Sequence, residues 1–332
     1  MNRLPTPEFR RLGSSGPAVF PLGLGCMGMS GMYGPSDEAE CVATLQAALD
    51  RGVNLIDTGD FYGMGHNEML IGRALKGRRD QALLSVKFGA LRSPDGNWIG
   101  VDTRPVAVKN FLAHTLTRLG VDHVDVYRPT RLDPNVPIEE TVGAIADLVK
   151  AGYVRAVGLS EVGAGTVRRA QAVHPITDLQ IEYSLISRGP EERIFPALAE
   201  LGVGVTAYGV LSRGLLSGSK PRGPADFRAT LPRFTEENRG KNDRLVAALA
   251  AVAKEKGATP SQLAIAWALA KGRQIVPVVG ARTRAQLAES LGALAIELTP
   301  ADVARLEAAV PASAVAGTRY HAPQMRILDS EK

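Results

Sequence analysis

Three side chains that could carry out proton transfer stand at or just beyond the ends of two short apolar runs. The run 53–56 ends in Asp57 and is followed five residues later by Tyr62, and the run 83–86 ends in Lys87. A tyrosine phenol has a pKa of about 10, so it exchanges protons poorly near neutral pH unless its anion is stabilised. A hydrogen-bonded ammonium group would stabilise that anion, and a buried ammonium group needs a carboxylate partner. We therefore expect Tyr62 to be the acid, Lys87 to tune it and Asp57 to hold Lys87; the alternative is a purely structural ion pair between Asp57 and Lys87.

No other catalytic pattern stands out in the sequence. It contains no GxSxG elbow and no Ser/His/Asp pattern, and its five histidines are not spaced as metal ligands. We expect no metal site. Electrons for a reduction would have to come from a bound cofactor, while the protein supplies orientation and a proton.

Eight apolar runs alternate with helix-like segments along the chain. This alternation favours parallel strands with helices outside, and eight strands favour a closed barrel over an open sheet. We therefore predict a single α/β domain over residues 1–332, a (β/α)8 TIM barrel with an N-terminal β-hairpin and long loops at the C-terminal face. The predicted strands are LGLGC, VNLID, LLSVK, VDVY, AVGLS, LQIE, VGVTAY and QIVPV, and the first is not followed by the GxGxxG fingerprint of a Rossmann fold.

The C-terminal ends of barrel strands are where functional residues lie. We expect the interior below those ends to be filled by Val, Ile, Leu and Ala. Three local features are also predicted: a first inner strand over residues 22–29, a helix capped by Ser36, and a helix over residues 242–256 after a Gly- and Pro-rich loop at 209–238. The side chains at the strand ends include Cys26, Met27, Asp57, Lys87, Arg128, Arg131, Ser160, Glu161, Gln180, Glu182, Tyr208 and Gly280.

The composition is that of a soluble globular protein. The 332 residues are 45% hydrophobic and 22% charged, and the net charge of +5 is spread along the chain, which indicates a mild preference for anionic ligands rather than a nucleic-acid surface. The sequence has two cysteines, no signal-peptide pattern and no apolar run of membrane-spanning length, and these features favour a cytoplasmic protein. Its oligomeric state is open.

Motifs along nearly the whole chain resemble those of the aldo-keto reductases, enzymes that reduce carbonyls with a nicotinamide cofactor. They include LGLGCMGMSGMYGP, GVNLIDTGDFYG, SVKFG, GYVRAVGLSEV, DLQIEYSLISR, ATPSQLAIAWALA and VPVVGARTRAQLAESLGAL. The opening LGxGCMGMS and the sequence GLSEV, in place of the commoner GLSN, are similar to the bacterial and plant branch of that family.

The resemblance implies roles for individual positions. Asp57, Tyr62 and Lys87 match three of the four catalytic residues. Ser160 and Gln180 match the pair that holds the nicotinamide carboxamide, and Tyr208 matches the ring stacked on the nicotinamide. The remaining matches lie in the loop that encloses the pyrophosphate and in the segment around the adenosine 2′-phosphate. Basic side chains in that segment favour NADPH over NADH. With Met27, these matches are Met27, Gly209, Leu211, Gly214, Leu215, Gly280, Arg282, Arg284, Gln286, Glu289 and Ser290.

The chain departs from the family at the fourth catalytic position. Thr130 stands in DVYRPTRLDP where the family has a histidine, and a hydroxyl is shorter than imidazole and does not titrate near neutral pH. Three consequences are open: Tyr62 suffices alone, with Thr130 or a bridging water positioning the carbonyl; Arg128 or Arg131 polarises the carbonyl; or turnover is so slow that the protein is a nucleotide-sensing regulator. Glu161 and Ser290 also replace asparagines of the family pattern.

We therefore predict NADPH-dependent reduction of an aldehyde or ketone, with Tyr62 as general acid tuned by Lys87 and Asp57, and Thr130 beside it. One alternative is a weakly active regulatory protein that binds a nicotinamide nucleotide. Another is a barrel without redox chemistry that acts on a phosphorylated sugar, which Lys87 and the arginines alone would support.

Overall fold

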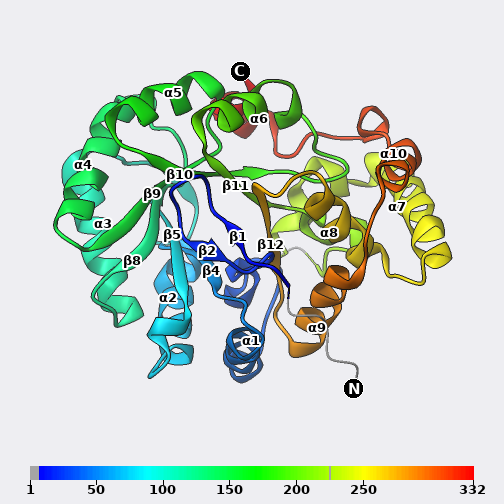
Figure 1. Cartoon of the computed structure of the whole chain (residues 1–332), viewed down its shortest axis with the longest axis horizontal. Helices are drawn as coiled ribbons and strands as arrows, with labels where there is room; N and C mark the ends of the chain where they lie inside the picture. Colours follow the sequence, from blue (N-terminus) through cyan, green and yellow to red (C-terminus); the bar gives the residue numbers. More distant parts are fainter. Residues whose placement is uncertain (1–6, 224–225) are drawn as a thin grey trace.

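The computed structural model describes residues 7–223 and 226–332, and within them eight parallel strands close into a barrel (Figure 1). Each barrel strand pairs with the next along the chain, and the last pairs with the first. This arrangement confirms the predicted (β/α)8 fold, and every predicted apolar run contributes a strand. The barrel strands are β3 (Gly23–Gly25), β4 (Leu55–Gly59), β5 (Leu83–Phe88), β8 (Val124–Pro129), β9 (Val154–Ser160), β10 (Ile176–Glu182), β11 (Gly204–Tyr208) and β12 (Ile275–Gly280).

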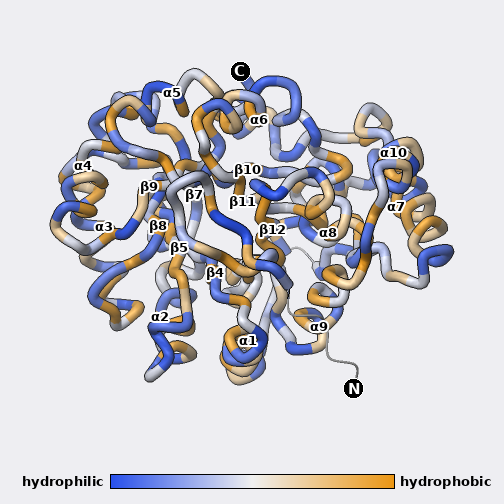
Figure 2. The backbone as a smooth tube through the Cα atoms, in the orientation of Figure 1, coloured by the Kyte–Doolittle hydropathy of each residue, from blue (hydrophilic) through white to orange (hydrophobic). Residues whose placement is uncertain are grey.

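Helices form a ring around the barrel (Figure 1). Successive helices from α1 to α6 pack against one another, α1 also packs against α9, and α10 packs on α7 and α8. Hydrophobic and hydrophilic stretches alternate along them (Figure 2), as expected for helices with one face on the barrel and one in water. None of the helices in the described residues is long and apolar enough to cross a bilayer. The helices are α1 (Glu38–Asp50), α2 (His66–Ala74), α3 (Pro105–Leu119), α4 (Ile138–Lys150), α5 (Ala164–Val173), α6 (Pro190–Leu201), α7 (Glu236–Glu255), α8 (Pro260–Ala270), α9 (Arg284–Gly292), α10 (Pro300–Ala309) and α11 (Ala322–Ile327).

Three of the predicted local features are wrong in their bounds. The first inner strand is only β3, because the chain turns into a 3-10 helix at Met27–Ser30. Asp37, not Ser36, caps α1: its carboxylate accepts the amide of Glu40, while the Ser36 hydroxyl donates to the carbonyl of Met29 at 2.8 Å. The helix predicted over 242–256 begins earlier, at the start of α7, because its polar first turns hide the helical period.

A second hairpin lies in the long loop after β5, where the sequence predicted no structure. It pairs β6 (Ala90–Arg92) with β7 (Trp98–Val101), antiparallel. The turn between them closes with a hydrogen bond from the amide of Ser93 to the carbonyl of Asn97 at 3.0 Å, and Gly96 takes the left-handed conformation (φ 82°). The Gly- and Pro-rich composition of this segment concealed the two strands.

The predicted N-terminal hairpin is present as β1 (Arg10–Arg11) and β2 (Ala18–Val19), and it closes the N-terminal end of the barrel. Leu12 and Val19 are fully buried and pack with interior side chains of the strands. The apolar residues of this bottom layer are Leu12, Val19, Leu55, Val126, Val276 and Val278.

The side chain of Arg10 joins this hairpin to the barrel. It donates three hydrogen bonds to the carbonyls of Leu269, Gly272 and Ile275, at 3.1, 2.9 and 2.5 Å. Burial lowers its pKa to about 10, which leaves it charged at neutral pH. Its neighbour Arg11 is exposed and donates only to the carbonyl of Gly16 within the hairpin.

We expect Arg10→Met to lower the free energy of unfolding by about 2 to 3 kcal/mol, because it leaves three carbonyls without a charged donor. Arg11→Met is the matched control and should change it by less than about 0.5 kcal/mol. Urea unfolding of both variants measures the difference. Equal effects would show that the hairpin is not held to the barrel through Arg10.

Candidate active site

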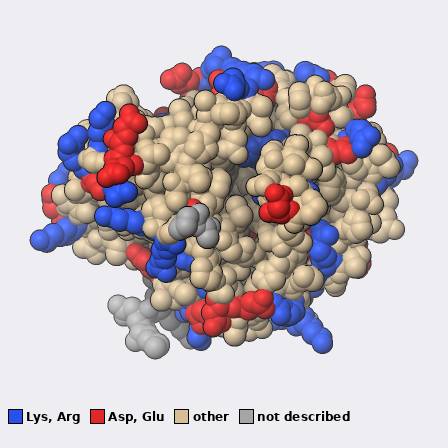
Figure 3. All heavy atoms as spheres, turned by 180° about the vertical axis from the view of Figure 1, so that it is seen from behind, with Lys and Arg blue, Asp and Glu red and all other residues tan. Residues whose placement is uncertain are grey.

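A cavity of about 550 Å³ opens at the C-terminal ends of the barrel strands. Figure 3 shows the face opposite to that of Figure 1, where charged side chains gather toward the rim around a central recess. Nearly all of the predicted site residues line the cavity. They are Met27, Asp57, Tyr62, Lys87, Thr130, Ser160, Gln180, Tyr208, Gly209, Leu211, Gly214, Gly280, Arg282, Gln286, Glu289 and Ser290.

Asp57 and Lys87 form a buried ion pair at the base of this cavity. Lys87 Nζ lies 2.6 Å from Asp57 Oδ1, and both residues are 4% exposed. The other carboxylate oxygen, Oδ2, accepts hydrogen bonds from Ser85 Oγ at 2.9 Å and from Gln180 Nε2 at 2.7 Å. Burial lowers the pKa of Lys87, and the Asp57 carboxylate opposes that shift. Both oxygens of the Asp57 carboxylate therefore have partners, and the charge of Lys87 is balanced by Asp57.

Tyr62 stands beside this pair, with only 7% of its surface exposed. Lys87 Nζ lies 5.2 Å from the centre of the phenol ring, and its hydrogen bond goes to Asp57. The expected hydrogen bond between Lys87 and the phenol oxygen is not formed. Burial raises the pKa of Tyr62 well above its usual value, and the negative charge of Asp57 raises it further. The phenol is thus fully protonated at neutral pH, as a proton donor must be.

A polar layer lies under the ion pair, where the sequence predicted only Val, Ile, Leu and Ala. Arg128 is fully buried and donates to both carboxylate oxygens of Asp178, at 2.8 and 3.0 Å. It also donates to Thr206 Oγ1 at 3.0 Å and to Ser85 Oγ at 3.1 Å. Since Ser85 in turn donates to Asp57, this layer supports the Asp57 carboxylate from below.

Arg128 and Arg131 occupy very different places. Arg128 does not line the cavity, so the hypothesis that it polarises a carbonyl there is wrong. Arg131 does line it, next to Thr130. The amide of Thr130 donates to the carbonyl of Phe88 at 2.8 Å, which fixes its backbone, and its side chain is 2% exposed.

The candidate carboxamide site lies at the ends of β9, β10 and β11. Ser160, Gln180 and Tyr208 all border the cavity. The Tyr208 hydroxyl donates to Glu161 Oε1 at 2.7 Å, so its ring is fixed from outside the cavity. Glu161 itself has the left-handed backbone (φ 54°), which non-glycine residues seldom adopt.

The predicted cofactor loop and adenosine segment are only partly at the cavity. Leu215 packs in the hydrophobic core, and Arg284 pairs with Glu40 at 2.9 Å on the surface, so the structure brings neither to the cavity. Arg282 does line it, and within the described part of the chain its guanidinium donates only to the carbonyls of Tyr33 and Pro35, at 3.2 and 3.3 Å.

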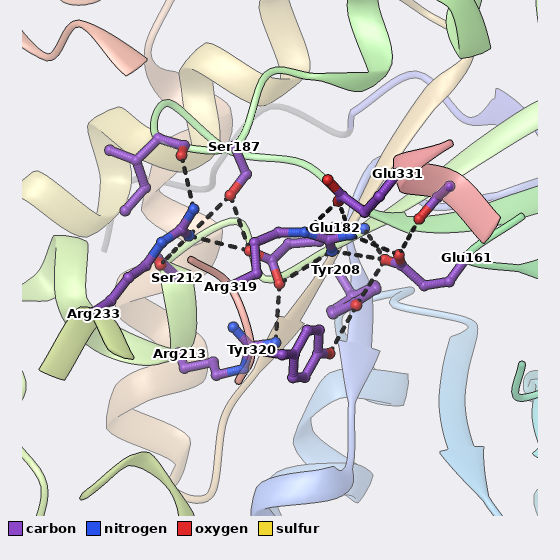
Figure 4. Close-up of polar contacts among 12 residues, drawn as sticks. Glu161, Glu182, Ser187, Tyr208, Ser212, Arg213, Arg233, Arg319, Tyr320 and Glu331 are labelled. Carbon is purple, nitrogen blue, oxygen red and sulfur yellow. Dashed lines mark hydrogen bonds and ion pairs between the residues drawn. The ribbon is translucent and has the colours of Figure 1, made fainter. Parts of the chain in front are cut away.

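A buried cluster of ion pairs supports the far wall of the cavity (Figure 4). Glu182 pairs with Arg213 at 2.9 Å and with Arg233 at 3.2 Å, and Glu161 pairs with Arg319 at 2.9 Å. The arginines lower the pKa of Glu182 to about 2 although burial alone would raise it. We call Glu161, Glu182, Arg213, Arg233, Arg319 and Glu331 the ion-pair cluster.

The ion-pair cluster anchors the C-terminal segment, which sequence reasoning did not connect with the site. Arg319 binds both Glu161 and Glu331, and the adjacent Tyr320 lines the cavity. The hydroxyls of Tyr320 and Tyr208 lie 3.0 Å apart. The only sequence signal was a tyrosine between an arginine and a histidine in a segment without helical periodicity, TRYHAP.

Comparisons with known proteins show which family this chain resembles. Residues 21–311 match the model of the "Aldo/keto reductase family". A soybean (Glycine max) protein named "Probable aldo-keto reductase 1" is 40% identical over 318 residues, which are 94% of this chain and 91% of that one.

Two solved structures illustrate the similarity in fold. The glycerol dehydrogenase AKR11B4 from Gluconobacter oxydans superposes with a TM-score of 0.82 at 27% identity and covers 93% of this chain and 97% of its own. The holo form of the aldo-keto reductase AKR11C1 from Bacillus halodurans gives a TM-score of 0.77 at 28% identity, over 92% and 97% of the two chains.

The ion pair between Arg128 and Asp178 in the polar layer should contribute to the stability of the fold. Arg128→Met leaves the fully buried Asp178 without its charged partner, so we expect the free energy of unfolding to fall by about 3 to 5 kcal/mol. The double variant Arg128→Met/Asp178→Leu removes both charges and should recover a large part of that loss.

Denaturant unfolding of these variants tests this expectation. Arg104→Met is the control, because Arg104 is 65% exposed in its pair with Asp102 and such pairs contribute at most about 1 kcal/mol. An Arg128→Met protein as stable as the control would contradict the supporting role of the layer.

Proposed function

This chain belongs to the aldo/keto reductase family, and on that premise we propose that it reduces an aldehyde or ketone to an alcohol with NADPH. The observation that best supports the proposal is the grouping of Tyr62, Lys87 and Asp57 on one wall of the cavity, with the last two 2.6 Å apart. A protonated phenol beside a compensated ammonium group is suited to give up a proton to a carbonyl oxygen.

The donors around the cavity fit a phosphorylated dinucleotide. The guanidinium of Arg282 has no carboxylate oxygen of the described residues within 4 Å, and it lies beside the N-terminus of α9, whose amide groups also favour an anion. We assign the 2′-phosphate to Arg282, with Gln286 and Ser290 beside it. Arg284 and Leu215 are left out of the assignment.

The other end of the cavity fits the nicotinamide. Ser160 and Gln180 offer a hydroxyl and an amide for the carboxamide, and the Tyr208 ring offers a flat surface. The loop with Gly209, Leu211 and Gly214 would enclose the pyrophosphate. When bound, NADPH supplies a hydride to the carbonyl carbon.

Tyr62 supplies the proton in this mechanism. Because burial keeps the phenol neutral, it can donate a hydrogen bond to the substrate oxygen before reaction and the proton during it. Positive charge nearby would stabilise the phenolate that remains: the charge of Arg131 opposes the rise in the pKa of Tyr62, and Lys87 Nζ lies 5.2 Å from the ring centre. Asp57 keeps Lys87 charged although it is buried, and Ser85 and Gln180 keep Asp57 in place.

Thr130 takes the place that a histidine has in the family pattern, and we assign it a minor role. Its hydroxyl has one proton to donate, and no charge. The carbonyl oxygen would therefore depend on Tyr62 more strongly than in a site with imidazole. The same substitution is what favours the second candidate function, a nucleotide-binding regulator with little turnover.

We expect the protein to oxidise NADPH when mixed with reactive aldehydes and diketones, and Tyr62→Phe to lower turnover about 10² to 10⁴-fold because the proton donor is lost. The loss of absorbance at the reduced-nicotinamide band measures both. Undiminished NADPH oxidation by Tyr62→Phe would end the assignment of Tyr62. Tight NADPH binding without turnover of any carbonyl would favour the regulator. If neither NADPH nor NADP⁺ raises the melting temperature, the barrel does not bind the cofactor at all.

If Arg282 binds the 2′-phosphate, its loss should affect NADPH binding and not NADH binding. Arg282→Met should weaken NADPH binding about 10- to 100-fold and leave NADH binding within about threefold, because only NADPH carries the extra phosphate. Arg284→Met is the matched control and should leave both unchanged, since its partner is Glu40. Titration calorimetry gives the two dissociation constants. An equal loss for NADPH and NADH in Arg282→Met would contradict the assignment.

A further inference from the structure

The cavity carries more positive than negative side chains. Among the residues that the structure describes, six cationic residues and two carboxylates line it. The carboxylates are those of Asp57 and Glu289, and the cations are Lys87, Arg92, Arg131, Arg213, Arg228 and Arg282.

Three of the cations are already neutralised by acids of the chain. Lys87 pairs with Asp57, Arg213 with Glu182 at 2.9 Å and Arg228 with Asp226 at 2.7 Å. Arg282 is assigned to the cofactor. That leaves Arg92 and Arg131, neither of which has a carboxylate oxygen of the described residues within 4 Å.

Arg131 lies at the reacting end of the cavity. It directly follows Thr130, and it is close enough to Tyr62 for its charge to oppose the rise in the pKa of that phenol. One amino group donates to the carbonyl of Thr130 at 2.6 Å and the other to the hydroxyl of Tyr320 at 3.3 Å. A guanidinium has five N–H donors, so most of its capacity is unused by these two contacts.

Tyr320, which accepts a hydrogen bond from Arg131, is itself fixed by the ion-pair cluster. Figure 4 shows the Tyr320 ring beside Arg213, with its hydroxyl directed to Tyr208. The Arg213 guanidinium lies 4.6 Å from the ring centre, and Arg319, the next residue back, is bound to Glu161. A rigid wall therefore presents a partly satisfied, half-buried cation to the cavity.

Arg92 approaches the same end from the β6–β7 hairpin. Its guanidinium lies 5.6 Å from the ring centres of both Phe61 and Trp98, and one amino group donates to the carbonyl of Gly96 at 3.0 Å. Phe61 in turn packs against Tyr62, with ring centres 4.7 Å apart. Arg92 thus borders the aromatic side chains next to the proposed acid, while the Arg131 guanidinium lies 5.8 Å from the ring centre of Tyr320.

We propose that Arg131, with Arg92 as a second cation, binds an anionic group on the carbonyl substrate, so that the enzyme acts on aldehydes or ketones that carry a carboxylate or a phosphate. This inference rests on the proposed function. Burial lowers the pKa of Arg131, but negative charge that includes Glu161 raises it above its usual value, so the guanidinium is charged without a direct carboxylate partner among the described residues. A substrate anion that matches the planar guanidinium with two hydrogen bonds would supply that direct partner. Neutral carbonyl compounds would leave both arginines unpaired.

Matched pairs of substrates test the proposal. The first pair is 4-carboxybenzaldehyde and benzaldehyde, and the second is glyceraldehyde 3-phosphate and glyceraldehyde. We expect the wild-type kcat/KM to favour the anionic member of at least one pair about 10- to 100-fold, and Arg131→Met to remove that preference while the neutral member stays within about threefold. Arg131→Lys should retain part of the preference, since it keeps the charge but not the planar fork. Whichever pair responds identifies carboxylate or phosphate as the anion.

Two further measurements keep the inference separate from the proposed function. Arg104→Met, which removes an exposed charge outside the cavity, should leave every preference unchanged. Titration calorimetry of the protein with benzoate, benzamide and inorganic phosphate should show binding of an anion that Arg131→Met loses and Arg104→Met retains.

These experiments distinguish a failure of the anion-binding inference from a failure of the proposed reductase function. Reduction of neutral and anionic members at equal rates, or an equal loss on both in Arg131→Met, overturns the inference and leaves the reductase intact. If no carbonyl is reduced, the proposed function fails, and the calorimetry decides the inference: anion binding that depends on Arg131 supports it, and binding that does not depend on Arg131 overturns it.

Discussion

The buried ion pair between Asp57 and Lys87 is the interaction on which the site depends, because two charges with 4% exposure are stable only when their remaining bonding capacity is used. Ser85 and Gln180 satisfy the second oxygen of Asp57. Ser85 is in turn held by Arg128, whose own charge is balanced by Asp178. Each buried charge thus needs a polar partner on a neighbouring strand, and the partners come from five strands, β4, β5, β8, β10 and β11. Together they form a polar network in the upper half of the barrel interior.

A second network of the same kind fixes the outer wall. Glu161 lies directly after β9 and Glu182 at the end of β10, and both would be costly there without the arginines that reach them from the loop after β11 and from the C-terminal segment. Because Arg319 comes from that segment, neutralising Glu161 also brings Tyr320 to the cavity. The GLSEV sequence, which departs from GLSN, is therefore connected with the anchoring of the chain's last residues. The neutralisation of Glu161 at the end of β9 by Arg319 therefore places Tyr320 in the wall of the cavity.

The sequence predicted those parts of the structure that depend on local pattern. Apolar runs and turn residues were enough for the eight strands, and the strand-end rule brought Asp57, Tyr62 and Lys87 to one place. What it missed depends on partners distant in sequence. Asp178 directly precedes the predicted strand LQIE, and nothing near it in sequence indicated that Arg128 would bind it across the barrel. The same holds for the Tyr320 wall, and for Arg284, which resembled a phosphate ligand until Glu40, at the other end of the chain, was found to pair with it.

The replacement of histidine by Thr130 changes where positive charge can act in the proposed reaction. An imidazole next to the phenol could donate to the carbonyl oxygen directly, whereas the Thr130 side chain is uncharged and its position is fixed by the backbone bond to Phe88. Arg131 is the next residue, it has no carboxylate partner among the described residues, and its two hydrogen bonds go to the carbonyl of Thr130 and the hydroxyl of Tyr320. The proposed site therefore has no imidazole at the reacting oxygen, and this cation lies at the wall. A site built in this way gains little by polarising the carbonyl and more by orienting the rest of the substrate, because a correctly held carbonyl needs, besides the hydride of the cofactor, one proton, which we assign to Tyr62.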